Sequence, residues 1–169
     1  MKTILWAALT ANGNYAQSSP EHPPKQEALD DFATQARAAG NFIVGRRTFE
    51  GMQASGGGSF DGIDIVVLSS RHKEIPGVKL VSSPQEALNY LQEKGHTIAL
   101  LSGGAELHNA FLAHGLVNEV IFNVVPVLEG KGLNLLLDQG HYQYQDVKLL
   151  DFKSAGNGVV QLHYALSHE

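Results

Sequence analysis

The sequence predicts an α/β fold in which helices cover both faces of a mostly parallel mixed sheet, with an antiparallel hairpin at one edge. Short apolar runs alternate with segments of helical periodicity along most of the chain. The end of the chain then holds two alternating segments around Gly156-Asn157-Gly158, a sequence typical of a hairpin turn. With 169 residues, 43% of them apolar, and no long linker, the chain is expected to form one domain over 1–169.

Hydrophobic period and turn residues predict the elements of the first half. The apolar run that begins after Lys2 carries no helix start signal, so we expect it to be a buried strand. A later segment has apolar side chains at helical spacing and ends at Gly40, which predicts a helix. The expected order is strand 2–10, loop 10–24, helix 25–40, strand 41–45, helix 45–52, a flexible segment 54–62 and strand 63–70.

The second half contains the helix with the clearest start and stop signals. Ser83 can cap it, Pro84 takes its first position, Glu86 follows the cap by three residues, and Gly95 ends it. Pro126 interrupts a long apolar strand, which predicts that this strand lies near a sheet edge or a bulge. The expected order is strand 78–83, helix 83–95, strand 97–102, helix 104–115, strand 117–128 and the hairpin 144–166.

Composition excludes several classes of function. A formal net charge of −5, with 12 Lys and Arg, gives no basic field for nucleic acid, so we expect no nucleic-acid partner. The absence of cysteine excludes disulfides, thiolate metal sites and a cysteine nucleophile. The apolar start at 4–9 is too short for a signal peptide, and no run approaches the roughly 20 apolar residues that span a bilayer. We therefore expect a soluble cytoplasmic protein with no membrane partner.

Three places where a strand runs into a helix or loop carry groups suited to an anion. In a parallel sheet, ligands collect at the carboxyl ends of the strands, where helix N-termini offer free N–H groups. Taken singly, the arginines can be solvated surface, the serines an ordinary turn and the glycines a tight connector. Together, the three would line one edge of the sheet and fit an extended ligand with several phosphates. They are Gly45, Arg46, Arg47 and Thr48; Ser69, Ser70, Arg71 and His72; and Ser102, Gly103, Gly104, Ala105 and Glu106.

Other ligand and catalytic motifs are absent from the sequence. No G-x-G-x-x-G follows the first strand, no P-loop sequence occurs, and no G-x-S-x-G suggests a hydrolase. The histidines form no H-x-x-x-H or H-E-x-x-H spacing, so we expect no metal site. His108 and His114 lie on one expected helix and are interpreted as surface or helix-end residues.

The order of these segments resembles the dihydrofolate reductase superfold, and more closely its branch that contains the reductase domain of the riboflavin-biosynthesis deaminase-reductase. The resemblance covers nearly the whole chain and implies a dihydrofolate-reductase-like three-layer fold. Its more specific landmarks are a glycine doublet followed by a GLV-type strand and a PVL-x-G-x-G turn. The matching segments are 6–9, 43–50, 66–70, 102–107 and 115–136.

The resemblance implies that NADPH binds along the sheet edge. By the family pattern, the pyrophosphate and the adenosine-side phosphate would contact Gly45, Arg46, Arg47 and Thr48. The ribose 2′-phosphate would be held by Ser69, Ser70 and Arg71, and the arginine would favour NADPH over NADH. The nicotinamide-side phosphates would lie beside Ser102, Gly103 and Gly104, a glycine pair often joined by a cis peptide bond in the family, with Ala105 and Glu106 opening the next helix. Backbone groups of Ala7 and Ala8 would bind the carboxamide, with Tyr15 and Ala16 in a mobile loop over the ring.

The substrate side is less well defined by the sequence. Reducing a C=N bond needs hydride on carbon and a proton on nitrogen, and folate-reducing members place a carboxylate on the first helix for this purpose. Asp30 and Asp31 lie in the corresponding helix, where an acidic pair can equally be solvated. The riboflavin branch often has S-x-D-G after its first strand. Here Asn12 replaces the aspartate, and it can hydrogen-bond a substrate but cannot act as an acid or base.

The leading hypothesis is an NADPH-dependent reductase acting on a small heteroaromatic or imine-like substrate, of the pterin or ribosylaminopyrimidine type. One alternative is a nucleotide-binding regulator or sensor that kept the cofactor cleft and lost turnover. Another is a structural or interaction protein whose glycine turns bind nothing. Family members are commonly dimers, and the apolar segment 118–128 could form an edge that pairs with a second copy, so we expect a homodimer.

Overall fold

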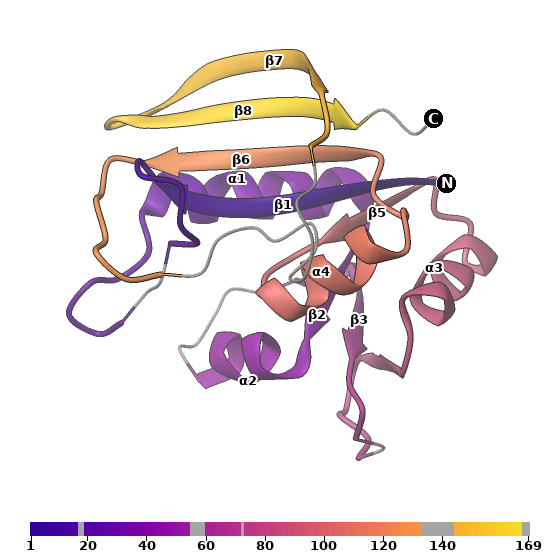
Figure 1. Cartoon of the computed structure of the whole chain (residues 1–169). Coiled ribbons are helices and arrows are strands. Elements are labelled where there is room, and N and C mark those ends of the chain that lie inside the picture. The colour runs from indigo at the N-terminus through magenta and orange to yellow at the C-terminus, as the bar shows by residue number, and fades with distance from the viewer. Residues whose placement is uncertain (17–18, 55–59, 72, 133–143, 167–169) are drawn as a thin grey trace.

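A single eight-stranded sheet, in the order β4-β3-β2-β5-β1-β6-β8-β7, runs through the part of the chain that the computed structural model describes (Figure 1). The described residues are 1–16, 19–54, 60–71, 73–132 and 144–166. The strands are β1 (Lys2–Thr10), β2 (Asn41–Gly45), β3 (Asp64–Leu68), β4 (Lys79–Val81), β5 (Ile98–Leu101), β6 (Glu119–Val125), β7 (Val147–Gly156) and β8 (Val159–Leu166). The helices are α1 (Gln26–Ala39), α2 (Arg46–Ala54), α3 (Pro84–Glu93) and α4 (Ala105–Ala113).

Strand directions confirm the predicted fold class. The strands from β4 to β6 in the sheet order are mutually parallel, whereas β8 pairs antiparallel with both β6 and β7. The β7–β8 hairpin turns at Asn157, which adopts a positive φ of 51°. Apart from β4 at the sheet edge, the parallel strands lie in the interior of the sheet, which accounts for the apolar runs in their sequences. Much of the segment predicted to be flexible, together with His72 and residues 133–136 of the family-like segment, lies outside the described residues.

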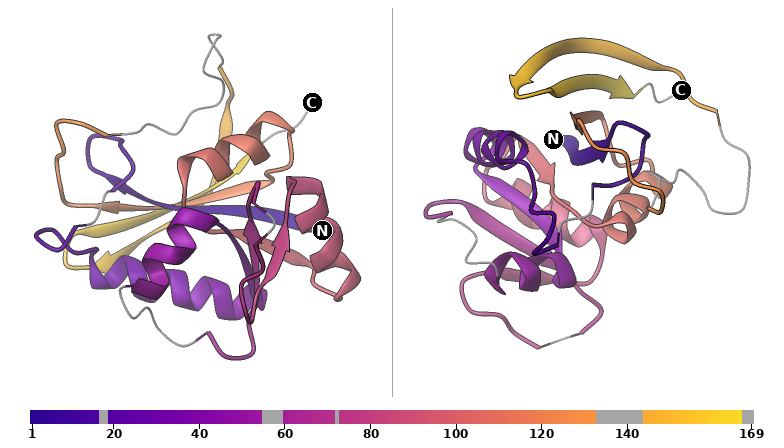
Figure 2. Two further views of the ribbon diagram at one scale, coloured as in Figure 1. Left: turned by 90° about the horizontal axis from the view of Figure 1, so that it is seen from below. Right: turned by 90° about the vertical axis from the view of Figure 1, so that its left-hand side faces the viewer.

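Helices cover both faces of the sheet, which gives the three layers (Figure 2). On one face, Phe32 of α1 and Phe49 of α2 pack against apolar side chains of the central strands. On the other face, Leu91 of α3 and Phe111 of α4 pack against the alternate side chains of the same strands. Among the described helices, none combines the length and the apolar character needed to traverse a bilayer.

The helix boundaries follow the predicted signals closely. Gly40 ends α1 with a φ of 78°, and its N–H donates to the carbonyl of Ala36 at 2.8 Å. The Ser83 hydroxyl caps α3 by accepting from the Glu86 N–H at 3.1 Å. The Glu86 carboxylate reaches one residue further back than the usual capping box, to the Ser82 N–H at 2.9 Å.

The prediction that the strand before Pro126 lies near an edge is wrong. β6 is hydrogen bonded to β1 on one side and to β8 on the other, and Pro126 follows its last residue. Because proline cannot donate to a ladder, the strand stops there and the chain leaves the sheet. Segment 118–128 therefore offers no free edge to a second copy. The described sheet instead ends at β7, where Val147, Leu149, Leu150 and Phe152 are exposed.

Candidate active site

The three predicted anion-binding junctions lie at neighbouring strand ends. Gly45 is the last residue of β2, Ser69 follows β3, and Ser102 follows β5. These strands are adjacent and parallel, so their carboxyl ends share one edge of the sheet. A backbone hydrogen bond ties the third junction to the neighbouring strand, because the Ser102 N–H donates to the carbonyl of Ile43 in β2 at 2.8 Å. The structure therefore brings the three junctions together.

The glycine pair lies against the first turn of α2. A Cβ atom added to Gly103 would come 3.3 Å from Thr48 Cγ2, and one added to Gly104 would come 3.4 Å from Thr48 Oγ1. Gly104 has a φ of 118° and precedes α4, which begins at Ala105 without a side-chain cap. The peptide bond between the two glycines is trans, unlike the pair that the resemblance implies. Two helices thus start side by side, and the backbone at α4 is left bare for an anion.

The arginines at this edge differ in whether their side chains already bind other groups of the protein. Arg46 donates from Nε to Glu50 at 3.1 Å and from a terminal nitrogen to the carbonyl of Lys73 at 3.4 Å. Its side chain is therefore partly committed to its own surroundings. Arg47 and Arg71 are exposed, and no ion pair to either is found within the described residues. Of the predicted cations, these two are the more available to a ligand.

Neighbouring polar groups complete the same edge. The Ser69 hydroxyl accepts the Arg71 N–H at 3.1 Å, which fixes the turn after β3. Ser70 between them is exposed. On α4, Glu106 is exposed in the first turn. Its negative charge interacts favourably with the positive end of the helix dipole but would repel a bound phosphate.

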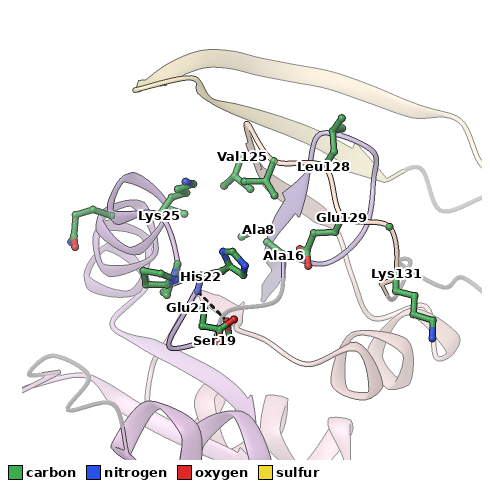
Figure 3. Close-up of a pocket in the computed structure, with 16 residues that line it drawn as sticks. Ala8, Ala16, Ser19, Glu21, His22, Lys25, Val125, Leu128, Glu129 and Lys131 are labelled. Carbon is green, nitrogen blue, oxygen red and sulfur yellow. Dashed lines mark hydrogen bonds between the residues drawn. The ribbon is translucent and has the colours of Figure 1, made fainter.

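A cavity of about 790 Å³ opens at the carboxyl ends of β1 and β6. It lies between the start of α1 and the loops that follow these two strands. In Figure 3, Ala8 and Ala16 lie between Lys25 on one side and Leu128 and Glu129 on the other. Ala8 and Ala16 belong to the predicted nicotinamide set, so the cavity lies where the resemblance would put the reacting ring. Its lining residues are Ala8, Ala16, Ser19, Glu21, His22, Pro23, Pro24, Lys25, Gln26, Ala28, Val125, Val127, Leu128, Glu129, Gly130 and Lys131.

Residues of β1 and of the following loop stay close together. Ala7 is buried on the α4 face of the sheet, whereas Ala8 faces the cavity. The Ala16 N–H donates to the Ala8 carbonyl at 2.9 Å, and Tyr15 forms a bridge with Leu9. The loop predicted to cover the ring thus folds back on the end of β1 and occupies one of the predicted carboxamide-binding groups.

Asn12 holds together the two loops that wall the cavity. Its amide nitrogen donates to the Glu129 carbonyl at 2.8 Å, and its amide oxygen accepts the Glu129 N–H at 3.2 Å. The hypothesis that Asn12 binds substrate is not supported, because its amide is used within the wall and it does not line the cavity. Gly132 in the PVL-x-G-x-G turn allows the same two loops to pack closely, because a Cβ atom there would come 2.7 Å from the Cβ of Asn14.

The two candidate acids of α1 point in different directions. Asp30 is exposed and accepts a hydrogen bond from Gln26 on the same helix at 2.8 Å. Asp31 faces the sheet, and its Oδ2 accepts from the Trp6 indole N–H and from the Asn123 amide, both at 2.9 Å. Neither carboxylate lines the cavity, but Asp31 lies one helical turn after Ala28, which does. The geometry therefore distinguishes Asp31 as the inward acid.

His108 is a residue whose importance the sequence did not reveal. The interpretation as a surface or helix-end histidine holds for His114, which is exposed at the C-terminal end of α4, but it is wrong for His108, which is fully buried. The reason is the direction of α4 packing, since the helix buries the face that also carries Leu107 and Phe111. The sequence signal for the burial of His108 was its position next to Leu107 and one turn before Phe111, two apolar residues at helical spacing.

The buried ring of His108 contacts both loops of the site. Its Nδ1 lies 2.7 Å from the Tyr15 hydroxyl, and its Nε2 lies 2.5 Å from the carbonyl oxygen of Ser102. Burial lowers the pKa of His108 to about 4, only partly opposed by the bond to Ser102. Burial also raises the pKa of the Tyr15 phenol. Both side chains are neutral at physiological pH.

Residues 3–161 match the family described as the RibD C-terminal domain. The chain belongs to that family. Reductases of the riboflavin pathway carry the RibD C-terminal domain. The match runs from β1 into β8 and so includes the three junctions and both loops of the cavity, which confirms the resemblance drawn from the motifs.

Individual relatives show how far the similarity extends. The uncharacterized protein YwjB of Bacillus subtilis (strain 168) is 39% identical over 74 residues, which cover 43% of this chain and 40% of YwjB. The putative riboflavin biosynthesis protein from Shewanella sp. PV-4 aligns over 99% of this chain and 100% of its own, with a TM-score of 0.78 and 19% identity. A pyrimidine reductase-like protein from Corynebacterium diphtheriae aligns over 99% of this chain and 92% of its own, with a TM-score of 0.76 and 14% identity. At these identities the two structures establish the shared fold.

Proposed function

We propose that this member of the RibD C-terminal domain family is an NADPH-dependent reductase. Its substrate would be a small heteroaromatic or imine-like molecule, of the pterin or ribosylaminopyrimidine type. The observation that carries the proposal is the shared edge at which α2 and α4 begin, with the glycine pair against Thr48. From β3 to β1 this edge crosses three strand spacings, about 14 Å. An extended dinucleotide matches that span, with one end at Arg71 and the other at the cavity.

The residues at the edge fit a nucleotide with several phosphates. The bare N–H groups at the start of α4 and the hydroxyl of Thr48 would bind the pyrophosphate, which the glycine pair allows to approach closely. Arg71, with Ser69 and Ser70 beside it, would hold the 2′-phosphate through charge-assisted hydrogen bonds. When bound, NADPH supplies the hydride.

The cavity supports a flat and largely apolar substrate core. Ala8, Ala28 and Val125 give it an apolar floor, and charged side chains at its rim include Lys25 and Lys131. Such a site excludes water from a ring and leaves polar substituents at the rim. The chain's main contribution to catalysis would be to position the acceptor carbon of the substrate against the nicotinamide.

For the proton we propose a role for Asp31 rather than Asp30. Asp31 is the carboxylate of α1 that faces the sheet, and the N–H groups of Trp6 and Asn123 hold its Oδ2. Its other oxygen accepts a longer bond, 3.3 Å, from the Gln35 amide and is the better placed to exchange a proton. Asp30 lies on the exposed side of the helix, where it accepts a hydrogen bond from Gln26.

One observation favours the alternative of a nucleotide-binding regulator. The family's S-x-D-G carboxylate is replaced by Asn12, whose amide is committed to the cavity wall. The experiment that separates the two functions is a turnover assay that follows loss of NADPH absorbance with dihydropterin, dihydrofolate and ribosylaminopyrimidine substrates. Reduction of any of them supports the reductase. Saturable NADPH binding without turnover of any supports the regulator, and binding of no nucleotide contradicts both.

We further infer that the protein is a cytoplasmic homodimer. The support for the dimer is the group of exposed apolar side chains on the β7–β8 hairpin, of which Phe152 is 68% exposed. Monomeric proteins rarely leave such groups uncovered. Sedimentation velocity tests the dimer, and cell fractionation tests the location.

A further inference from the structure

A buried histidine joins the two loops that meet at the candidate site. His108 in α4 is 0% exposed, and its two ring nitrogens contact Tyr15 and Ser102 at 2.7 and 2.5 Å. The rings of Tyr15 and His108 also pack together, with centroids 5.5 Å apart. The three residues form one continuous chain of hydrogen bonds, called here the histidine bridge.

Chemistry fixes the direction of both bonds in the histidine bridge. The Ser102 carbonyl can only accept, so Nε2 of His108 carries the hydrogen and donates it. Burial keeps the ring neutral, so Nδ1 carries no hydrogen and must accept from the Tyr15 hydroxyl. Tyr15 therefore donates to His108, and His108 donates to Ser102. Each polar atom of the buried ring has a partner.

The ends of the histidine bridge lie in two different parts of the proposed NADPH site. Tyr15 belongs to the segment that folds over the end of β1, where the next residue, Ala16, donates to the Ala8 carbonyl. Ala8 and Ala16 both line the cavity. Ser102 is 5% exposed and directly precedes the glycine pair at the start of α4. The bridge thus links the nicotinamide end of the site to the phosphate end.

Burying a polar ring on this face of α4 costs free energy. Leu107 and Phe111 occupy the same face of α4, and a leucine in place of His108 would avoid the cost of burying two polar nitrogens. A fully satisfied buried network does what an apolar contact cannot, because it specifies one relative arrangement of the groups that it joins. That property matters where a loop and a turn must bind two ends of one ligand.

We propose that His108 is a positioning residue that holds the Tyr15 segment and the Ser102–Gly104 turn in the one relative geometry that binds a whole dinucleotide. The inference rests on the proposed function, because NADPH is the ligand that spans both parts. It requires that breaking the bridge weaken the binding of intact NADPH. A fragment that occupies only the Arg71 end should bind as before.

Tyr15→Phe is the sharpest test, since it removes only the hydroxyl of the bridge. We expect the Kd for NADPH, measured by isothermal titration calorimetry, to rise about five-fold, the effect of losing one hydrogen bond. The Kd for adenosine 2′-monophosphate, which lacks the 5′-phosphate that would reach the glycine turn, should not change. His108→Gln should weaken NADPH binding to a similar extent. The double variant should bind NADPH little worse than either single variant, because both changes break the same histidine bridge. Tyr164→Phe is the matched control, since Tyr164 is a partly buried tyrosine against the same core cluster.

Each outcome separates this inference from the function on which it rests. An unchanged NADPH constant in Tyr15→Phe overturns the inference and leaves the reductase standing. Equal weakening of the binding of NADPH and of adenosine 2′-monophosphate indicates a general loss of structure and also overturns it. Failure of the unmodified protein to bind either ligand overturns the proposed function and this inference together. Nitrogen-15 NMR of the His108 ring adds a check without nucleotide, in which hydrogen on Nε2 is expected and hydrogen on Nδ1 contradicts the bridge.

Discussion

Replacing His108 with glutamine should remove a large part of the acid sensitivity of folding. Burial lowers the pKa of His108 from 6.5 to about 4 in the folded protein. The unfolded chain therefore binds this proton more readily, and stability that is fully present above pH 6.5 is lost as the pH falls towards 4. With these two pKa values, the free energy of unfolding should fall by about 2 kcal/mol between about pH 7.5 and about pH 5 because of this residue alone.

Urea unfolding of the wild type and of His108→Gln at both pH values measures this difference. The variant loses its bond to Tyr15 at either pH, so the comparison is between the two pH dependences and not between absolute stabilities. Carboxylates with lowered pKa, such as Asp64 beside His96 and Lys94, contribute equally to both proteins. His114→Gln, at an exposed histidine at the end of the same helix, is the control and should keep the wild-type dependence. If the free energy of unfolding of His108→Gln falls with pH as much as that of the wild type, the assignment of His108 as a buried neutral histidine is refuted.

Four further changes test the site and the assembly. Arg71→Gln should weaken the binding of NADPH on the order of ten-fold and leave the affinity for NADH unchanged in nucleotide titrations. An equal loss of affinity for both nucleotides would contradict a role of Arg71 in binding the 2′-phosphate. Gly103→Ala should weaken NADPH on the order of ten-fold, because the methyl group crowds the α2 turn and blocks close approach, and unchanged affinity would place the phosphates elsewhere. Asp31→Asn should lower kcat on the order of 100-fold while Asp30→Asn stays within about two-fold, and the reverse order would contradict the assignment. Phe152→Glu should convert the dimer to a monomer in sedimentation velocity, and an unaffected dimer would exclude the β7–β8 surface.

Local signals in the sequence predicted the elements well. Gly40 and Ser83 act as the predicted end of α1 and cap of α3, because both effects depend only on residues within one turn. Periodicity likewise identified every described strand and helix. The prediction for Pro126 is wrong because the order of strands in the sheet is not a local property. Only the pairing of β6 with β8, formed by residues far along the chain, shows that β6 is interior.

The site was predicted where backbone and sequence neighbours determine it, and missed where long-range contacts do. The three junctions met at one edge because parallel strands present their carboxyl ends together. The difference between Asp30 and Asp31 depends on the rotation of α1 over Trp6 and Asn123, which an acidic pair in a helical pattern does not reveal. The role of His108 depends on Tyr15, 93 residues away along the chain.

Trp6 offers a direct test of whether the sheet edge binds NADPH with its nicotinamide at the cavity. Trp6 is the only tryptophan, and it packs in the same small core cluster as the cavity residues Ala8 and Ala16. Titration with NADPH and with NADH, exciting Trp6 and recording energy transfer to the reduced nicotinamide, reports both binding and proximity. We expect saturable energy transfer to both nucleotides, with NADPH saturating at a clearly lower concentration than NADH. No saturable transfer from either nucleotide would contradict it.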